Sequence, residues 1–378
     1  MGEQPSRPTS ILVVSNHGAI VGGGELSLMD LLRGLDRDRW APVLVVPDED
    51  DVAARGRDLD LPVHVIPLPT LRRPGPGSVW SVNALVRLAR ATDAALIHAN
   101  GSRAMAYAGV AGRLAARPTL WHVRIAESDG LVDRALCAIA TVVIATSRAV
   151  ARRFPWAPAK IRLIANGIDL ERFTPRPQSG ALRAKLGVPP SAPVALSIGR
   201  HVAEKGYRHL LDAAAVIERA KPGVHWILVG NGELRSELEA QTRRLHLGSQ
   251  VHFTGWREDI PDVLALSDVF VLSSESEGFG RVLVEAMAMN RAVVATAVGG
   301  VPDIVLAGET GLLVEPANPV ALADAVRAVL DDPARAARLG AAGRARAESI
   351  FSRGAHVDAV DRVYAEVLGR VVSEARRR

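Results

Sequence analysis

The sequence predicts an α/β protein of two domains, each built on a parallel β-sheet covered by helices. Short apolar runs alternate with longer helical patterns from one end of the chain to the other. Most of these runs are rich in valine and isoleucine and apolar on both faces, which is typical of strands in a covered parallel sheet. The chain has 378 residues. Since a typical domain holds roughly 100–200 residues, two domains are expected.

Thirteen runs are predicted to be strands. Seven of them precede a break in the pattern, at 11–15, 43–46, 63–66, 95–98, 119–122, 142–145 and 162–164. Six follow it, at 194–198, 226–229, 251–253, 269–272, 292–295 and 311–314. Strands that alternate with helices of this length imply βαβ units.

The break coincides with a proline-containing segment at 174–180. Proline removes a backbone donor and disfavours helix on its N-terminal side, so the segment is interpreted as an interdomain linker. We expect an N-terminal domain over 1–174 and a C-terminal domain over 175–350. The remainder, 351–378, is predicted to hold a helix at about 355–374 with no strand after it, and its return to the first domain is left open.

Composition favours a globular protein of a reducing compartment. Hydrophobic residues make up 48% of the chain and charged residues 23%, which is ordinary for a soluble domain. The single cysteine, Cys137, stands in an apolar stretch and is interpreted as a core residue. The apolar run 11–14 is too short for a signal peptide, and the run 135–145 falls short of the roughly 20 residues that a membrane span needs. A cytoplasmic location is therefore expected.

The charge pattern does not favour nucleic-acid binding. The net charge is +5, acidic and basic residues are interspersed, and aromatic residues make up only 4%. The last three residues, 376–378, are all arginine. A solvated chain end is the simpler interpretation of these arginines, and a peripheral contact with the inner membrane surface is left open.

The most informative stretch is 273–288, which follows a predicted strand and opens a helix. Gly278 and Gly280 let the backbone approach a ligand, and the free N–H groups at the helix start favour an anion such as phosphate. Two carboxylates, Glu277 in the loop and Glu285 in the helix, would bracket that phosphate and suit the vicinal hydroxyls of a sugar. The alternative is that Glu277 caps the helix and Glu285 is solvated.

The string from Ser274 to Pro316 resembles the signature of glycosyltransferase family 4, a family of retaining enzymes. That family has the GT-B fold, in which the parallel sheets of two Rossmann-like domains face an interdomain cleft. Three further segments match in the family's order. They are the diphosphate motif at 198–206, the loop before the linker at 166–169, and the glycine-rich turn at 22–25.

The resemblance implies a role for each matched residue. Arg200 and Lys205 would bind the donor diphosphate, where fixed positive charge suits a departing anion. Glu285 would hold the ribose hydroxyls and Glu277 the hydroxyls of the transferred sugar, with Arg257 near the nucleobase. The backbone of three further residues would cradle the sugar and phosphate: Gly278, Phe279 and Gly280. A loop of the other domain would face the phosphate and consists of Gly22, Gly23 and Gly24.

The N-terminal domain would supply the remaining contacts. His122 ends a predicted strand, and the carboxyl ends of parallel strands face the ligand crevice. The resemblance puts this histidine beside the sugar, whereas on sequence alone a core histidine is an equal alternative. His122, Arg200, Lys205 and Glu277 are thus the expected catalytic residues. The candidate acceptor contacts are Asn16, His17, Asn100, Arg103 and Arg124.

Two positions depart from the family's pattern. Asn290 replaces the usual glycine after a helix, where a left-handed conformation is expected and asparagine is the best substitute. Asp303 replaces the more usual glutamate and carries its charge on a shorter arm.

Other functions fit less well. A nicotinamide-dependent dehydrogenase would use Asp48 on the ribose, but the turn at 18–24 lacks the G-x-G-x-x-G spacing. A metal-dependent transferase would need an Asp-x-Asp motif, yet the pairs at 36–38 and 58–60 do not follow long apolar strands and are predicted to be solvated turns. A phosphorylase needs a cofactor-binding lysine, and the chain has only four lysines. A same-fold sugar-nucleotide epimerase and a non-catalytic nucleotide-sugar-binding homologue stay open as alternatives.

The sequence thus predicts a retaining glycosyltransferase that uses a UDP- or GDP-linked sugar and needs neither metal nor cofactor. No residue stands out as a covalent nucleophile, so the leaving diphosphate is expected to accept the proton of the acceptor hydroxyl. The acceptor would belong to bacterial glycan, glycolipid or natural-product synthesis.

Overall fold

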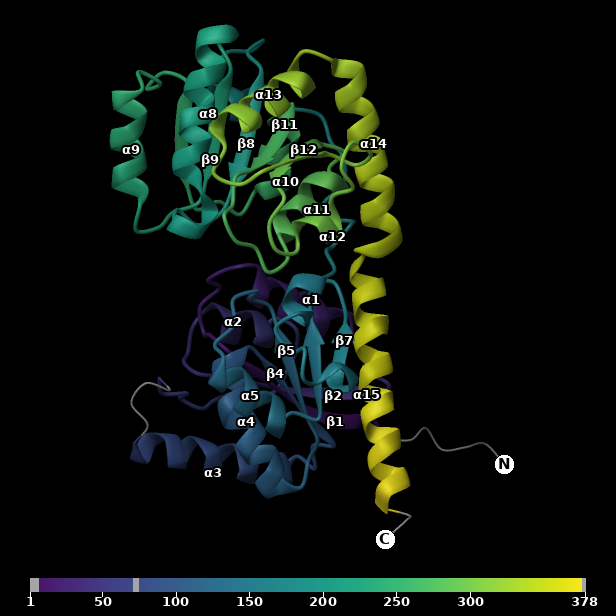
Figure 1. Cartoon of the computed structure of the whole chain (residues 1–378). Helices are drawn as coiled ribbons and strands as arrows, with labels where there is room; N and C mark the ends of the chain where they lie inside the picture. Colours follow the sequence, from purple (N-terminus) through teal and green to yellow (C-terminus); the bar gives the residue numbers. More distant parts are fainter. Residues whose placement is uncertain (1–6, 71–74, 376–378) are drawn as a thin grey trace. The chain divides into compact units, whose positions relative to one another are not determined.

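A computed structural model describes residues 7–70 and 75–375 (Figure 1). The arginines at 376–378, for which a lipid contact was left open, lie outside the described residues. The chain divides into two compact units, of which the first runs to Gly167 and resumes at Arg353, and the second is Ile168–Ser352. The division falls after Gly167, ahead of the expected linker, and the Ile168 N–H bonds to the Phe351 carbonyl within the second unit at 2.9 Å.

Within the described residues, the first unit holds a seven-stranded parallel sheet with the order β3-β2-β1-β4-β5-β6-β7. The strands are β1 (Thr9–Ser15), β2 (Trp40–Val46), β3 (Val63–Val65), β4 (Leu96–Asn100), β5 (Thr119–Val123), β6 (Val142–Ala145) and β7 (Ile161–Leu163). The α-helices are α1 (Gly23–Gly34), α2 (Asp51–Arg57), α3 (Pro76–Ala91), α4 (Ser102–Ala115), α5 (Leu131–Ile139), α6 (Arg148–Ala151) and α15 (Arg353–Ala375).

Helices cover both faces of this sheet because its central strands carry apolar side chains on both faces. Successive side chains of a strand point to opposite faces. Leu12 and Val14 of β1 accordingly pack with residues of α3, α4 and α5. Ile11 and Val13 pack on the other face with residues of α1, α2 and α15. The last helix is thus part of the first unit's core.

The second unit holds a six-stranded parallel sheet over its described residues, with the order β10-β9-β8-β11-β12-β13. The strands are β8 (Val194–Ile198), β9 (His225–Val229), β10 (Val251–Gly255), β11 (Val269–Leu272), β12 (Ala292–Thr296) and β13 (Leu312–Val314). The α-helices are α7 (Gly180–Lys185), α8 (Tyr207–Ala220), α9 (Arg235–Arg244), α10 (Ile260–Leu266), α11 (Arg281–Ala288), α12 (Val301–Ile304), α13 (Pro319–Leu330) and α14 (Pro333–Ile350). All thirteen predicted strands are present in the described chain, so the prediction of two parallel-sheet domains is confirmed.

Both sheets reverse their strand order at one point. In the first sheet β1 lies between β2 and β4, and in the second β8 lies between β9 and β11. Connections leave such a point toward opposite faces, which opens a crevice at the carboxyl ends of the two central strands, where ligands of open α/β sheets bind. A ligand is therefore expected to contact the loops after β1, β4 and β5 and those after β8 and β11.

Several smaller predictions can be checked. Cys137 is buried in the core of the first unit, and Asn290 has a φ of 60°, the left-handed conformation expected for it. Both aspartate pairs, at 36–38 and 58–60, lie exposed in turns. In the described part of the chain, no helix is both long and apolar enough to span a bilayer.

Candidate active site

The loops after β8 and β11 meet through a salt bridge between two predicted site residues. Lys205 ends a short 3₁₀ helix (Ala203–Lys205) after β8, and Glu277 lies in the loop after β11. The Lys205 ammonium lies 2.5 Å from Glu277 Oε1, and the Ser274 hydroxyl donates to the same oxygen at 2.9 Å. Glu277 is only 7% exposed. Because a buried carboxyl group is costly without hydrogen-bond partners, these two donors satisfy Glu277 Oε1 at the edge of the crevice.

Glycines allow these loops to approach one another. Gly206 has a φ of 60°, and a Cβ there would lie 2.1 Å from the Ser273 carbonyl oxygen. Gly299 has a φ of 51°, and its Cβ would lie 1.8 Å from the carbonyl oxygen of Glu277. The Gly300 N–H donates to that same carbonyl at 2.9 Å. No L side chain fits at either position, so the backbone around Glu277 is fixed by glycine packing.

The other donor-side residues have partners of their own. Arg200 is half-exposed and pairs with Glu204 at 3.1 Å, while Arg257 holds Asp259 through both carboxylate oxygens. That hydrogen-bonded guanidinium lowers the pKa of the Asp259 carboxyl.

Glu285 forms a buried pair with Arg281, whose Nε donates at 2.8 Å. Sequence reasoning missed Arg281, although its i,i+4 spacing to Glu285 was a usable signal. Gly280 precedes this helix with a φ of 95°. Phe279 is buried with its ring edge-on to Phe351, which leaves the backbone of 278–280 as the part of this loop available for the predicted cradle.

In the first unit, Asn16, His17 and Arg103 form one network at the carboxyl ends of β1 and β4. The Asn16 side chain accepts from the Ala104 N–H and contacts the His17 ring at 2.8 Å. Arg103 donates to the Asn16 carbonyl and contacts His17 Nδ1 at 3.3 Å. Gly101, with a φ of 119°, makes room for the Asn16 side chain 2.7 Å from where its Cβ would be.

A second group gathers around Arg124 at the end of β5. Its guanidinium donates to Asn100 Oδ1 at 2.9 Å and to Asn166 Oδ1, and it lies 3.4 Å from His122 Nδ1. A Cβ on Gly24 would lie 3.2 Å from Arg124 Cδ, so the glycine turn lies against this group. All the predicted first-unit residues thus stand at the carboxyl edge of this sheet.

His122 is completely buried. Its ring lies 3.3 Å from His98, between Nδ1 and the His98 Nε2, and its centroid is 5.9 Å from that of His356. Burial, followed by the charge of Arg124, lowers the pKa of His122 well below its usual range and that of His98 to about 3. Both rings are therefore neutral near pH 7. His98, His356 and Tyr364 were not among the predicted site residues, because nothing in the local sequence places them beside His122.

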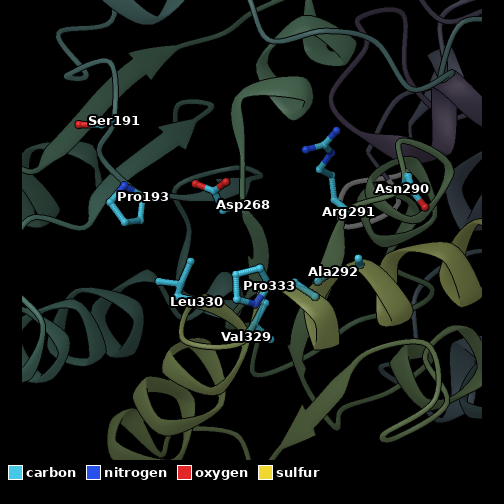
Figure 2. A pocket seen from close by; sticks show the side chains of 11 residues that line it. Ser191, Pro193, Asp268, Asn290, Arg291, Ala292, Val329, Leu330 and Pro333 are labelled. Atoms are coloured by element: carbon cyan, nitrogen blue, oxygen red, sulfur yellow. The ribbon is translucent and has the colours of Figure 1, made fainter.

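A pocket of about 400 Å³ lies at the opposite, amino edge of the second sheet (Figure 2). It is lined by residues that precede strands, such as Pro193 before β8, Asp268 before β11 and Arg291 before β12. Apart from Asn290, no residue that the sequence singled out lines it. Since ligands of such sheets bind at the carboxyl edge, this pocket is separate from the candidate site.

Models of known protein families match the sequence of each unit. A model described as glycosyl transferases group 1 matches residues 178–346, and one described as glycosyltransferase family 4 matches residues 21–172. The crystal structure of Anabaena HepE in complex with UDP and glucose aligns with a TM-score of 0.83 at 28% identity, covering 94% of this chain and 99% of HepE. The fold is therefore the GT-B fold.

Two curated relatives show the range of the likeness. The lipopolysaccharide core biosynthesis glycosyltransferase LpsE of Rhizobium meliloti is 37% identical over 177 residues, 47% of this chain and 51% of LpsE. A GDP-mannose-dependent monoacylated α-(1-6)-phosphatidylinositol monomannoside mannosyltransferase of Corynebacterium glutamicum is 35% identical over 202 residues, 50% of this chain and 52% of the relative. The chain matches about half the length of each. With both family models matching in order, the chain belongs to glycosyltransferase family 4.

Proposed function

We propose that this protein transfers a sugar from a nucleoside-diphosphate donor to an acceptor hydroxyl with retention of anomeric configuration. The second unit would hold the donor, with Arg200 and Lys205 on the diphosphate and Glu277 on the sugar hydroxyls. Glu285 would take the ribose and Arg257 would border the base. No metal or cofactor takes part in this mechanism.

The Lys205–Glu277 pair supports this proposal most directly. It joins the two loops at the switch point of the second sheet, where a cation and a buried carboxylate stand 2.5 Å apart. An ammonium has three N–H donors, so Lys205 can keep Glu277 and still bind a phosphate oxygen. The pair therefore offers one group for a phosphate beside one for sugar hydroxyls, which is the arrangement a sugar nucleotide requires.

Catalysis would rest on positioning and charge. As the bond between the anomeric carbon and the diphosphate breaks, negative charge develops on the leaving oxygen, and Lys205 and Arg200 stabilise it. The acceptor hydroxyl attacks the same face and gives its proton to the departing diphosphate. The protein thus holds the reactants together without a covalent intermediate.

The comparisons favour UDP as the nucleotide of the donor. HepE, 28% identical along nearly its whole length, was crystallised with UDP and glucose. The corynebacterial relative is named for GDP-mannose, so GDP is the alternative. LpsE is named for lipopolysaccharide core synthesis and the corynebacterial relative for a phosphatidylinositol mannoside. We therefore propose a hydroxyl of a bacterial glycan or glycolipid as the acceptor.

Nucleotide binding tests the proposal. We would measure the thermal unfolding of the purified protein with UDP, GDP, ADP, dTDP and NAD, each with and without EDTA. A ligand at about 100 times its Kd stabilises by roughly 2.7 kcal/mol, which such a measurement resolves. We expect a shift with UDP that EDTA does not change. A shift only with NAD, or one that EDTA removes, would contradict the proposed donor and the metal-independent mechanism respectively.

A further inference from the structure

A chain of ring and hydroxyl groups links His122 to the last helix of the first unit. The Tyr364 hydroxyl on α15 lies 2.7 Å from His98 Nδ1, and His98 Nε2 lies 3.3 Å from His122 Nδ1. Tyr364, His98 and His122 are all completely buried. Water therefore does not compete for these groups, and each must take its hydrogen-bonding role from its neighbours.

Arg124 determines which atoms donate and which accept in the hydrogen bonds that join Tyr364, His98 and His122. A guanidinium only donates hydrogen bonds, so His122 Nδ1, which faces Arg124 Nη2 at 3.4 Å, must present its lone pair. His98 Nε2 also faces His122 Nδ1, at 3.3 Å, and must carry a proton because that nitrogen is the acceptor. Burial keeps the His98 ring neutral, with its pKa lowered to about 3. A neutral ring has one N–H, so His98 Nδ1 accepts from the Tyr364 hydroxyl.

The remaining nitrogen of His122 is then a hydrogen-bond donor. The neutral ring must carry its proton on Nε2, an atom that is buried and has no hydrogen-bond partner among the described residues. A buried polar group without a partner costs free energy that a purely structural histidine would avoid. His356 does not supply the missing partner, because its ring is tilted by 32° against that of His122 with the centroids 5.9 Å apart, and its own Nδ1 faces the Ala165 carbonyl at 2.7 Å.

We infer that Tyr364 and His98 are positioning residues that hold His122 as the neutral tautomer with its proton on Nε2. His122 would then serve substrate as a hydrogen-bond donor, not as a base. The catalytic meaning of this inference rests on the proposed function, because only a bound donor or acceptor would use that N–H. The tautomer itself does not depend on substrate.

Nitrogen NMR of the full-length protein tests the inference. In ¹⁵N-histidine-labelled protein, long-range ¹H–¹⁵N correlations distinguish protonated from unprotonated ring nitrogens, and His98→Gln and His122→Gln assign the two rings. We expect Nε2–H on both rings. Tyr364→Phe removes the hydroxyl that donates to His98 Nδ1. The Nε2–H tautomer of His98 should then lose population, although Arg124 still favours it, and kcat should fall about fivefold, the factor that one hydrogen bond is worth.

Tyr107→Phe is the matched control. Tyr107 is also buried in the first unit, but its hydroxyl donates to the Pro69 carbonyl at 2.8 Å, away from the histidines. This variant should leave both tautomers and kcat as in the wild type. A wild-type His122 with its proton on Nδ1, or a His98 tautomer that Tyr364→Phe does not alter, would overturn the inference. Because the spectra need no substrate, a protein with these tautomers that transfers no sugar would count against the proposed function alone.

Discussion

Two side chains from loops 72 positions apart in the chain, Lys205 and Glu277, share a hydrogen bond of 2.5 Å. The sequence predicted both as ligand-binding residues, from the resemblance, but gave no sign that they touch. Their contact has a chemical consequence at the residue scale. The contact fixes the two side chains next to each other, so they suit a ligand that is anionic at one end and rich in hydroxyls at the other.

Removal of Lys205 should therefore abolish turnover. Lys205→Ala would leave Glu277 buried without its cation. It would also remove the positive charge that stabilises the departing diphosphate, so we expect kcat to fall by at least about 100-fold. Stabilisation by UDP should also disappear. Lys221→Ala is the control, since Lys221 forms a salt bridge of equal length with Asp331, 2.5 Å, on the surface of the same unit. Equal losses in the two variants would contradict the assignment of Lys205.

The buried His98 should make the protein less stable in mild acid. Its pKa is lowered from an ordinary 6.5 to about 3, so between these values the unfolded chain binds a proton that the folded chain does not. The stability present above pH 6.5 is then lost as the pH falls toward 3, by up to about 1.4 kcal/mol per pH unit. Urea unfolding from pH 7 to 5 should show a shallower dependence in His98→Gln than in the wild type. His64→Gln, which removes an exposed histidine, should retain the wild-type dependence.

At the scale of elements, the strands were the most predictable part of the molecule. Every expected strand formed because Val- and Ile-rich runs that are apolar on both faces have few alternatives to a covered parallel sheet. The ends were less certain. β2 begins at Trp40, three residues before the expected start, although Pro42 lies within it. The pairing with β3 begins only at Leu44, so Pro42 stands where the neighbouring strand does not yet require an N–H donor.

The candidate site was predicted in its residues but not in its contacts. Strand ends and the resemblance pointed to His122, Arg124 and Asn100, which the fold does bring together. The partners that complete the group, His98 and Tyr364, are separated by 266 positions. No local pattern encodes such a contact, because it exists only once the last helix has packed on the sheet.

The glycine turn before α1 is predicted to serve ligand binding at Gly22 without being required there by the fold. Gly22 has a φ of 177°, extended backbone that any residue adopts, and a Cβ there would meet no atom within 4 Å. The folded chain therefore does not require glycine at this position. We expect Gly22→Ala to keep the melting temperature of the wild type and to lower kcat/KM, because the empty space would be needed by the donor phosphate.

Gly24→Ala provides the contrast. Its Cβ would press on Arg124 at 3.2 Å, so this variant should lower stability as well as activity. An unchanged kcat/KM in Gly22→Ala, measured beside Gly24→Ala, would remove the turn from the site.

At the scale of the whole molecule, the first unit depends on both ends of the chain. Val360 and Tyr364 of α15 are fully buried in its core. The Trp40 indole N–H also donates to Asp361 at 2.5 Å, and Arg162 pairs with Glu366. α15 is therefore a structural layer of the first sheet, although the entire second unit separates it from the rest of that unit in sequence.

Val360→Asp should unfold the first unit while the second persists. An uncompensated buried charge costs about 3–5 kcal/mol, and Val360 is 0% exposed. We expect the variant to lose one thermal transition and to keep another that UDP still shifts. Asp358→Ala changes an exposed residue two positions away on the same helix and should unfold like the wild type. Loss of both transitions in Val360→Asp would show that the units are not independently stable.

The return of α15 also sets the order in which the chain can complete its folding during synthesis. The second unit, Ile168–Ser352, is one uninterrupted stretch, so it can close its core as soon as it has left the ribosome. The first unit is translated earlier but finishes later, since one face of its sheet is covered only in part, by α1 and α2, until the helix that begins at Arg353 emerges. Until then, the core that contains Ile11 and Val13 lacks the apolar side chains of α15, such as Val360 and Tyr364, and leaves apolar surface uncovered. A nascent chain stalled before residue 353 should therefore bind chaperones through the part of the protein that was made first.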